Sequence, residues 1–338
     1  MRSAILDIGS NSAHLKIVDL EPGEPARDVR SVKRPTRLAE SLRRDGRLGP
    51  AAAGRLGASV AEALAVARAE GAQELIAFAT SALRDAVNRG EIVAGLAART
   101  GVEPAFLSGE DEARLTFLAA RGWYGWSGGP LLLADIGGGS LEIATGEGAE
   151  PDLAMSLPLG AGRLTRDHLP GDPPGRKDVK RLRGFVRERL AECLPRGPYD
   201  PGPEPARAIA TSKIFTQLAK LNRRKDADGN RILRRKDLRA QIPRLAGMTA
   251  AQRTRLKGVS ASRAPQILAG AVVAEAVMGH LGLKRLEICP WALREGIALR
   301  RIQHLDGLGP HSDDIAHLLR TLPEGRARLQ AVAGQSSA

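Results

Sequence analysis

The sequence predicts an α/β fold built from two related units. Its 338 residues are enough for two domains. Apolar runs typical of buried strands alternate with segments of helical periodicity, which indicates a central sheet covered by helices. One pattern, an apolar strand, a tight turn containing Asp, Gly and Ser, and a second strand, occurs twice, after Ala4–Leu6 and after Leu131–Ala134. The repetition favours a duplicated unit.

The first half opens with this pattern: the turn is Asp7–Ser12 and the second strand is 14–18. Residues 21–25 are rich in Pro and Gly and predict a turn. Residues 51–70 carry apolar residues at helical spacing, so we expect an amphipathic helix, with Gly71 where a helix C-cap belongs.

A buried strand is predicted at 75–79, and Thr80 and Ser81 follow it as helix N-cap residues. A helix over 88–99, a strand over 102–107 and a helix from residue 108 complete this half. We place the first domain at 1–122, because 122–130 is rich in Trp and Gly and indicates a boundary.

The second half restarts with the turn Asp135–Ser140 between strands 131–134 and 141–144. A domain over 123–292 would then hold the following elements: a basic helix at 178–194, a strand-to-helix turn at 208–213, a long apolar helix at 264–282 and a short strand at 287–290. We expect a helix at 293–305 to pack back on the first domain. The tail, 306–338, is predicted to be partly disordered.

The charge and composition limit the possible partners. The net charge of +13 favours a polyanionic partner, although an Arg-rich composition that keeps the protein soluble is an equal explanation. Only 3% of the residues are aromatic, which argues against single-stranded nucleic acid held by base stacking. The first strand begins near Met1, and no long apolar segment is present, so we expect a cytoplasmic protein without membrane contact. Cys193 and Cys289 have no metal-ligand spacing and are expected to be reduced thiols.

The two turns have the chemistry of a phosphate cradle. Glycines allow a close approach of the backbone to an anion and direct N–H groups at it. The candidates for phosphate binding are Gly9, Ser10 and Asn11 in the first turn and Gly138, Gly139 and Ser140 in the second. An aspartate at the end of each strand, Asp7 or Asp135, is suited to hold a metal ion or a water molecule.

Six segments in order resemble the exopolyphosphatase/guanosine pentaphosphate phosphohydrolase family over about residues 2–303. They are Asp7–Ser12, Ala79–Arg84, Ser108–Leu115, Asp135–Glu142, Ser156–Leu164 and Leu293–Gly296. The chain is most similar to the short, two-domain members from actinobacteria. The resemblance implies two actin-like ATPase domains (ribonuclease H-like, ASKHA superfamily) with an interdomain cleft. Two departures are Leu141, where the family commonly has Thr, and Thr211-Ser212-Lys213, where it commonly has Ser-Gly-Thr.

The resemblance also implies roles for individual residues. Glu112 aligns with the proposed catalytic glutamate, which orients or deprotonates the attacking water. Asp135 and Glu142 would be carboxylate ligands of Mg²⁺ or another divalent cation, and Asp7 would hold a metal-bound water or the turn itself. The alternative for Glu142 is a solvated strand residue. For Glu110, complementing the dipole of the following helix is preferred over catalysis, and Asp111 is left open.

Arg84 is a candidate phosphate ligand because a guanidinium pairs with two phosphate oxygens; the alternative is an ion pair with Asp85. Lys213 in the third turn would favour a bare phosphate chain, unless it lies along the helix surface. The run from Lys220 to Asp237 holds eight basic and three acidic residues, either as a path for a polyanion or as a solvated, mobile loop.

The function that these features imply is that of an exopolyphosphatase, with Mg²⁺ or another divalent cation as cofactor and inorganic polyphosphate as substrate. The alternatives are a guanosine pentaphosphate (pppGpp) phosphohydrolase, a sensor that binds (p)ppGpp or polyphosphate with little turnover, and a kinase of the same superfamily. The family resemblance also implies a homodimer. We expect (p)ppGpp as a ligand or inhibitor, and no specific nucleic acid.

Overall fold

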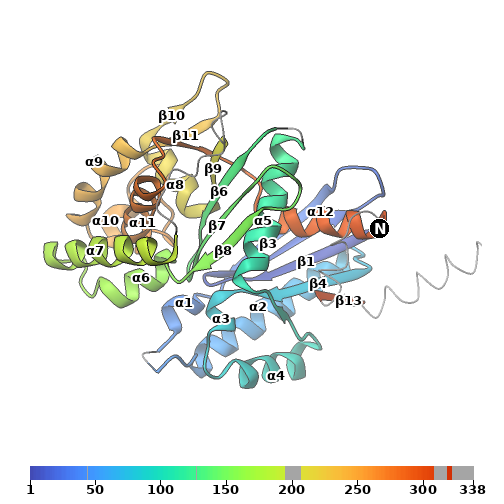
Figure 1. The fold of residues 1–338 in the computed structure, drawn as a ribbon. Helices are drawn as coiled ribbons and strands as arrows, with labels where there is room; N and C mark the ends of the chain where they lie inside the picture. The colour runs from blue at the N-terminus through green and yellow to red at the C-terminus, as the bar shows by residue number, and fades with distance from the viewer. Residues whose placement is uncertain (44, 127, 195–206, 308–317, 322–338) are drawn as a thin grey trace, which may run out of the picture. The chain divides into compact units, whose positions relative to one another are not determined.

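A computed structural model of the 338-residue chain describes residues 1–43, 45–126, 128–194, 207–307 and 318–321. The chain divides into two compact units (Figure 1). The first unit contains Met1–Ser108 and the chain from Leu293 onward, and the second contains Gly109–Ala292. The segments 195–206, 308–317 and 322–338, which include most of the predicted tail, lie outside the described residues.

The first unit holds one mixed sheet and helices on its two faces. The strand order is β13-β4-β1-β2-β3, and β5 also pairs with β4. The elements are β1 (Arg2–Ile8), β2 (Ser12–Asp19), β3 (Arg27–Pro35), α1 (Leu38–Ser41), α2 (Pro50–Ala69), β4 (Glu74–Ala79), α3 (Ser81–Arg84), α4 (Arg89–Thr100), β5 (Ala105–Phe106), α12 (Leu293–Leu305) and β13 (Leu319–Thr321).

The second unit holds a seven-stranded mixed sheet in the order β10-β11-β12-β9-β6-β7-β8. The elements are α5 (Gly109–Tyr124), β6 (Leu131–Ile136), β7 (Leu141–Gly146), β8 (Leu153–Leu157), α6 (Ala161–His168), α7 (Arg176–Cys193), β9 (Arg207–Thr211), α8 (Ser212–Asn222), β10 (Arg224–Lys225), β11 (Arg231–Arg234), α9 (Arg235–Ala246), α10 (Ala250–Thr254), α11 (Ile267–His280) and β12 (Arg285–Ile288).

The two sheets share one five-strand arrangement. In the first unit, β3, β2 and β1 are antiparallel neighbours, and β4 and β5 continue the sheet in parallel. In the second unit, β8, β7 and β6 are antiparallel, and β9 and β12 continue in parallel. The duplicated unit expected from the sequence is therefore present, and the predicted fold class, two actin-like α/β domains, is confirmed.

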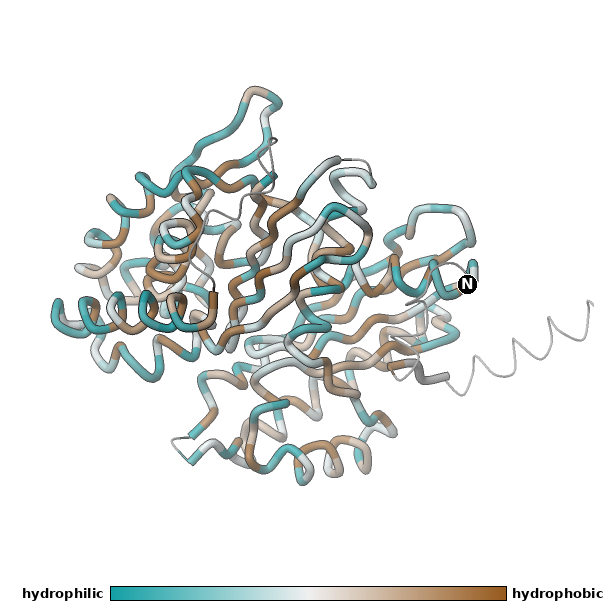
Figure 2. Tube along the Cα trace, in the orientation of Figure 1, coloured by the Kyte–Doolittle hydropathy of each residue, from teal (hydrophilic) through white to brown (hydrophobic). Residues whose placement is uncertain are grey.

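Side chains of β6 alternate between two apolar layers, as the two-residue period of a strand requires. Leu131 and Leu133 pack with Ala113 and Phe117 of α5. Leu132 and Ala134 belong to a larger core on the other face, which includes most of α11. Helix α11 has no polar stripe and is buried on all sides. Glu275 is the polar residue among its buried side chains. Figure 2 shows that α11 is mainly hydrophobic, whereas α7 carries many hydrophilic residues along its length.

In the first unit, α2 packs against β2 and β3, with Ala4, Leu6 and Ile8 of β1 in the same core. Helix α12 contacts β1, and three ion pairs tie it to the sheet: Arg294–Asp7, Glu295–Lys16 and Arg301–Glu74. The last of these is deeply buried, and Ser3 also donates to Glu74 at 2.5 Å.

Most predicted elements are present, with two kinds of difference. The strand expected over 102–107 is only Ala105–Phe106, and the charged strand β3 and the half-buried strand β8 gave no clear apolar alternation to predict them. The basic run Lys220–Asp237 forms the end of α8, the hairpin β10–β11 and the start of α9.

Helix α5 contacts β6, β7 and β8 of the second unit, and the predicted domain limits at residues 122 and 292 stay a prediction. No described helix is both long and apolar enough to cross a membrane.

Candidate active site

Asp135 and Glu142 face each other across the hairpin formed by β6 and β7. They are register partners, so their side chains lie on one face of the sheet. Side chains two residues apart on a strand lie on the same face. Leu133 lies two residues before Asp135 and Ala144 two residues after Glu142, and both pack with α5. The two carboxylates therefore lie on the side covered by α5. Ser156 of β8, the next register partner, donates its hydroxyl to Glu142 Oε1 at 2.9 Å.

In the glycine turn between these strands, carbonyl groups accept hydrogen bonds from α6, and the N–H groups have a different environment. The carbonyl oxygens of Gly137 and Gly138 accept the N–H groups of Ala161 and Arg163 at 3.0 and 2.9 Å. Arg163 Nε also donates to Gly139 O at 2.9 Å. Within the described chain, the N–H groups of Gly138 and Gly139 donate to no backbone carbonyl. These N–H groups are therefore candidate donors for an anion such as phosphate, although Gly139 itself is buried beneath Gly160.

The start of α6 rests directly on this turn. A Cβ atom at Gly160 would lie 2.2 Å from Gly139 C and 2.3 Å from Ser140 N, and one at Gly162 would lie 2.9 Å from Gly138 O. Both positions therefore need glycine, because the contact is backbone against backbone. This packing, together with the hydrogen bonds from Ala161 and Arg163, fixes the shape of the turn.

Glu112 lies in the first turn of α5, on the same side of the sheet as Asp135 and Glu142. The helix begins at Gly109, which is pressed against Ser156: a Cβ there would lie 2.3 Å from Ser156 Cβ. Since Ser156 also holds Glu142, the first turn of α5 begins beside the carboxylate pair. Glu112 is 8% exposed, whereas Glu110 is exposed and pairs with Arg114 at 2.7 Å. These positions favour a surface role for Glu110 and a site role for Glu112.

The third turn follows Thr211, the register partner of Asp135 in β9. The Thr211 hydroxyl donates to Trp291 O at 2.8 Å. Ser212 has φ +85°, a left-handed conformation that is costly for a residue other than glycine. Its hydroxyl is buried and has no hydrogen-bond partner in the described structure. Ser212 stands where the family commonly has glycine, and its backbone explains that preference.

The first unit repeats part of this arrangement. Asp7 ends β1 as Asp135 ends β6, and the helix on its side of the sheet is α12, whose Arg294 donates to Asp7 Oδ2 at 2.6 Å. Burial raises the pKa of the Asp7 carboxyl, and the charge and hydrogen bond of Arg294 offset only part of the rise. Asp7 is thus held by an arginine, which supports a role in fixing the turn; the predicted metal role remains a prediction.

Ser10, Asn11 and Arg84 lie around the ends of β1 and β4. Ser10 and Asn11 are buried, and the Ser10 hydroxyl lies 3.1 Å from that of Ser81 at the start of α3. Arg84 donates to Leu107 O at 2.7 Å and pairs with Asp85 at 3.3 Å. The alternative that the sequence allowed for Arg84, an ion pair with Asp85, is therefore present, and phosphate binding by Arg84 remains a prediction.

The carboxylates of the second unit fit a magnesium ion better than a zinc ion. Mg²⁺ uses one or two carboxylates and keeps water or phosphate oxygens, which matches the pair Asp135 and Glu142. A zinc site needs three or four protein ligands of the His, Cys or carboxylate type. No group of three such side chains able to hold a metal occurs among the residues that the structure describes.

The sequence model of the Ppx/GppA phosphatase family matches residues 17–305. The chain belongs to this family. Exopolyphosphatase 1 of Mycobacterium tuberculosis is 48% identical over 306 residues, which cover 89% of this chain and 88% of that protein. Exopolyphosphatase 2 of the same organism is 33% identical over 88% of this chain and 98% of its own length.

Solved structures agree with the assignment. The crystal structure of the Aquifex aeolicus member of the Ppx/GppA family superimposes with a TM-score of 0.73 at 25% identity. The match covers 90% of this chain and 99% of that one. The duplicated sheet described above is thus the fold of this family.

Sequence reasoning missed four residues that position the candidate site. They are Ser81, Ser156, Arg163 and Arg294, which hold Ser10, Glu142, Gly139 and Asp7 respectively. Each lies far along the chain from its partner. All four residues fall inside the six segments that resemble the family. Their partners could not be predicted, because the pairing depends on the topology of the two sheets.

Proposed function

We propose that this protein is an exopolyphosphatase that releases orthophosphate from the end of inorganic polyphosphate. The observation that carries the proposal is the second unit's site in a chain 48% identical to an exopolyphosphatase. There, Glu112, Asp135 and Glu142 lie on one side of the sheet, beside a glycine turn in which the N–H groups of Gly138 and Gly139 donate to no backbone carbonyl of the described residues. These groups match the parts that phosphoanhydride hydrolysis needs.

In the proposed reaction, Gly138 and Gly139 hold a terminal phosphate through their N–H groups. Glu112 accepts a hydrogen bond from a water molecule and orients it in line with the bridging oxygen. The water oxygen bonds to the terminal phosphorus as the bridging P–O bond breaks, and a water proton passes to Glu112. The products are orthophosphate and a chain shortened by one phosphate. Ser156 keeps Glu142 in place, and Arg163 keeps the turn in shape.

We propose Mg²⁺ or another divalent cation as the cofactor, with Asp135 and Glu142 as the residues that would hold it. When bound, the ion would neutralise charge on the phosphate oxygens as the anhydride breaks. This assignment predicts that chelation abolishes turnover and that Asp135→Asn raises the divalent-ion concentration needed for half-maximal rate.

Orthophosphate release tests the proposal. The substrates are tripolyphosphate, long-chain polyphosphate, guanosine pentaphosphate and ATP at equal phosphate concentration with Mg²⁺. Glu112→Gln is expected to lower the rate by about 10²–10⁴-fold, the usual contribution of a general base, with binding of polyphosphate retained. Glu110→Gln is the matched control, because it changes the same chemical group in the same helical turn at an exposed position.

The outcomes separate the candidate functions. Release from polyphosphate that is lost in Glu112→Gln and kept in Glu110→Gln supports the proposed function. Release mainly from guanosine pentaphosphate would move the function to that substrate. Tight binding without release from any of the four would make the protein a sensor, and equal rates in the two variants would remove Glu112 from the mechanism.

We also propose inorganic polyphosphate as the physiological partner, a homodimer as the assembly and the cytoplasm as the location. Binding of (p)ppGpp as ligand or inhibitor is tested by its effect on the rate with tripolyphosphate. Sedimentation at several protein concentrations tests the dimer.

A further inference from the structure

Helix α7 carries a stripe of cations along one face. Arg176, Lys180, Arg183 and Arg187 are spaced by four, three and four residues, which places them on one side of an α-helix. Eleven residues separate the first from the last, so the stripe extends over about 17 Å of helix axis. Arg176, Lys180 and Arg187 are exposed and form no ion pair within the described chain.

The stripe lines a groove between α7 and α9 with a volume of about 780 Å³. Its other walls come from Pro173, Pro174, Val179 and the residues Ile242, Pro243 and Ala246 of α9. All four charged residues that line the groove are the cations of the stripe, and the lining contains no carboxylate. Four positive charges against an apolar wall produce a strong attractive potential for an anion.

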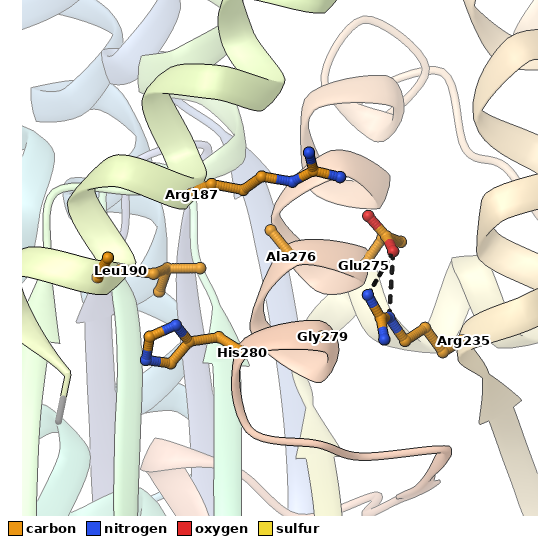
Figure 3. Close-up of a pocket in the computed structure, with 8 residues that line it drawn as sticks. Arg187, Leu190, Arg235, Glu275, Ala276, Gly279 and His280 are labelled. Atoms are coloured by element: carbon orange, nitrogen blue, oxygen red, sulfur yellow. Dashed lines mark hydrogen bonds and ion pairs between the residues drawn. The ribbon is translucent and has the colours of Figure 1, made fainter. Parts of the chain in front are cut away.

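Arg187 also lines a second cavity of about 450 Å³ at the end of the stripe, between α7, α9 and α11. Figure 3 shows Arg187 reaching over Ala276 toward Glu275, while Arg235 reaches Glu275 from α9. Arg235 Nη2 lies 3.1 Å and Arg239 Nε 2.8 Å from Glu275 Oε1, and Arg183 lies 3.5 Å from Oε2.

Glu275 does not neutralise this cluster. Burial tends to raise the pKa of Glu275, but hydrogen bonding and the charges of Arg239, Arg235 and Arg183 outweigh it, so the carboxyl pKa is lowered and the group is ionised. Three arginines pair with this single carboxylate, and Arg187 lines the same cavity, so the four arginines leave an excess of three positive charges. Gly279 allows this packing, because a Cβ there would lie 2.2 Å from Arg235 Nη2.

We propose that the stripe and the cavity form an accessory site for an extended phosphate chain, separate from the candidate catalytic residues. The planar guanidinium forks suit phosphate oxygens, and the linear spacing suits a chain rather than a single ion. The lining of both cavities contains no Phe, Tyr or Trp on which a nucleic acid base could stack, so inorganic polyphosphate is favoured over single-stranded nucleic acid.

The position on α11 separates the Glu275 end of this site from the glycine turn. Gln266, just before α11, lies beside Gly162, since a Cβ at Gly162 would be 3.4 Å from its side chain. Glu275 is nine residues farther along, which is about 14 Å of helix. That the bound chain is the distal part of the substrate rests on the proposed function, whereas the binding itself does not.

The test compares two triple variants with the same net charge. Arg176→Gln/Lys180→Gln/Arg187→Gln removes three cations from the groove, and Lys177→Gln/Arg181→Gln/Arg189→Gln removes three from other faces of α7. All six side chains are exposed, so both variants are expected to fold, which thermal melting checks. Binding of long-chain polyphosphate, tripolyphosphate and oligouridylate is measured at several salt concentrations without divalent cations, so that no turnover occurs.

The groove variant is expected to bind long-chain polyphosphate at least about tenfold more weakly, with a salt dependence reduced by up to about three ions. The control variant should keep most of the affinity and the slope. Equal weakening in both variants, or none in either, would overturn the inference, as would a groove-dependent interaction with oligouridylate alone. Groove-dependent binding of tripolyphosphate as well as the long chain would mean that the site needs only a few phosphates.

Turnover separates this inference from the proposed function. The groove variant should raise KM for long-chain polyphosphate and leave kcat, and both constants for tripolyphosphate, unchanged. A protein without turnover on any phosphate substrate would refute the proposed function and leave the binding result intact. Normal turnover with binding unaffected by the groove variant would refute the accessory site alone.

Discussion

Replacing Gly160 with alanine tests how the phosphate turn is held. The added Cβ would lie 2.2–2.4 Å from three backbone atoms of Gly139 and Ser140. Real Cβ contacts are essentially never shorter than 3.0 Å, so the backbone must separate by about 0.8 Å, the difference between 3.0 and 2.2 Å. No flexible side chain is available to absorb this movement, because the neighbouring atoms all belong to the main chain.

The size of the effect follows from this displacement. Overpacking of this kind costs about 1–3 kcal/mol, which corresponds to a fall in the melting temperature of roughly 2–10 °C for a unit of this size. The backbone that moves is the one whose N–H groups would hold phosphate. A misplacement of about 1 Å in a catalytic site lowers a rate by about 10²-fold, so phosphate release should fall by about that factor.

The assay measures thermal unfolding and, well below the melting temperature, orthophosphate release from tripolyphosphate. Gly95→Ala is the matched control: Gly95 is exposed in α4, and a Cβ there meets nothing within 4 Å. Because alanine has a better helix propensity than glycine, Gly95→Ala should stabilise the protein by up to about 1 kcal/mol without changing the rate. If Gly160→Ala melts and turns over like the parent protein, the argument that this contact shapes the turn is wrong.

Three further substitutions have expected outcomes. Ser212→Gly should stabilise the protein by about 1 kcal/mol by relieving the strain at φ +85°; a lower melting temperature would contradict this. Arg121→Met should cost about 3 kcal/mol or more in denaturant unfolding, because the fully buried guanidinium donates to the carbonyls of Gly129, Gly146 and Gly148, and a stability near that of the parent would argue against it. The pKa of Glu275 is lowered from 4.5 in the folded state, so its ion pairs contribute stability above about pH 4.5 that is lost as the pH falls through the folded-state pKa. Glu275→Gln should weaken this acid dependence in melting curves between about pH 3 and 7, and parallel curves for both proteins would refute it.

Local pattern was sufficient for most of the fold. The helix α2 was predicted from the helical spacing of its apolar residues, and α11 and the strands β1 and β6 from their continuous apolar runs. β3 was not predicted, because Val29 and Val32 are its only aliphatic residues and it lies at the edge of the sheet. Its pairing with β2, rather than its own residues, makes it a strand.

The candidate site was predicted as residue types and not as contacts. The position of Glu112 relative to Asp135 and Glu142 depends on the face that α5 covers, which only the packed structure gives. Likewise, nothing near Asp7 in the sequence indicates that its partner is Arg294, because these residues meet only through the packing of α12 on β1. The basic stripe of α7 is the exception: its spacing can be read in the sequence, although the groove beside it cannot.

The return of α12 to the first sheet has a consequence for the order of folding during synthesis. The second unit is continuous in sequence, Gly109–Ala292, and can complete its core as soon as it leaves the ribosome. The first unit begins earlier in the sequence but is completed later. Its residues Asp7 and Glu74 form ion pairs with Arg294 and Arg301, which are synthesised after the second unit. A nascent chain stopped at residue 292 should therefore have a protease-resistant second unit and a protease-sensitive first one.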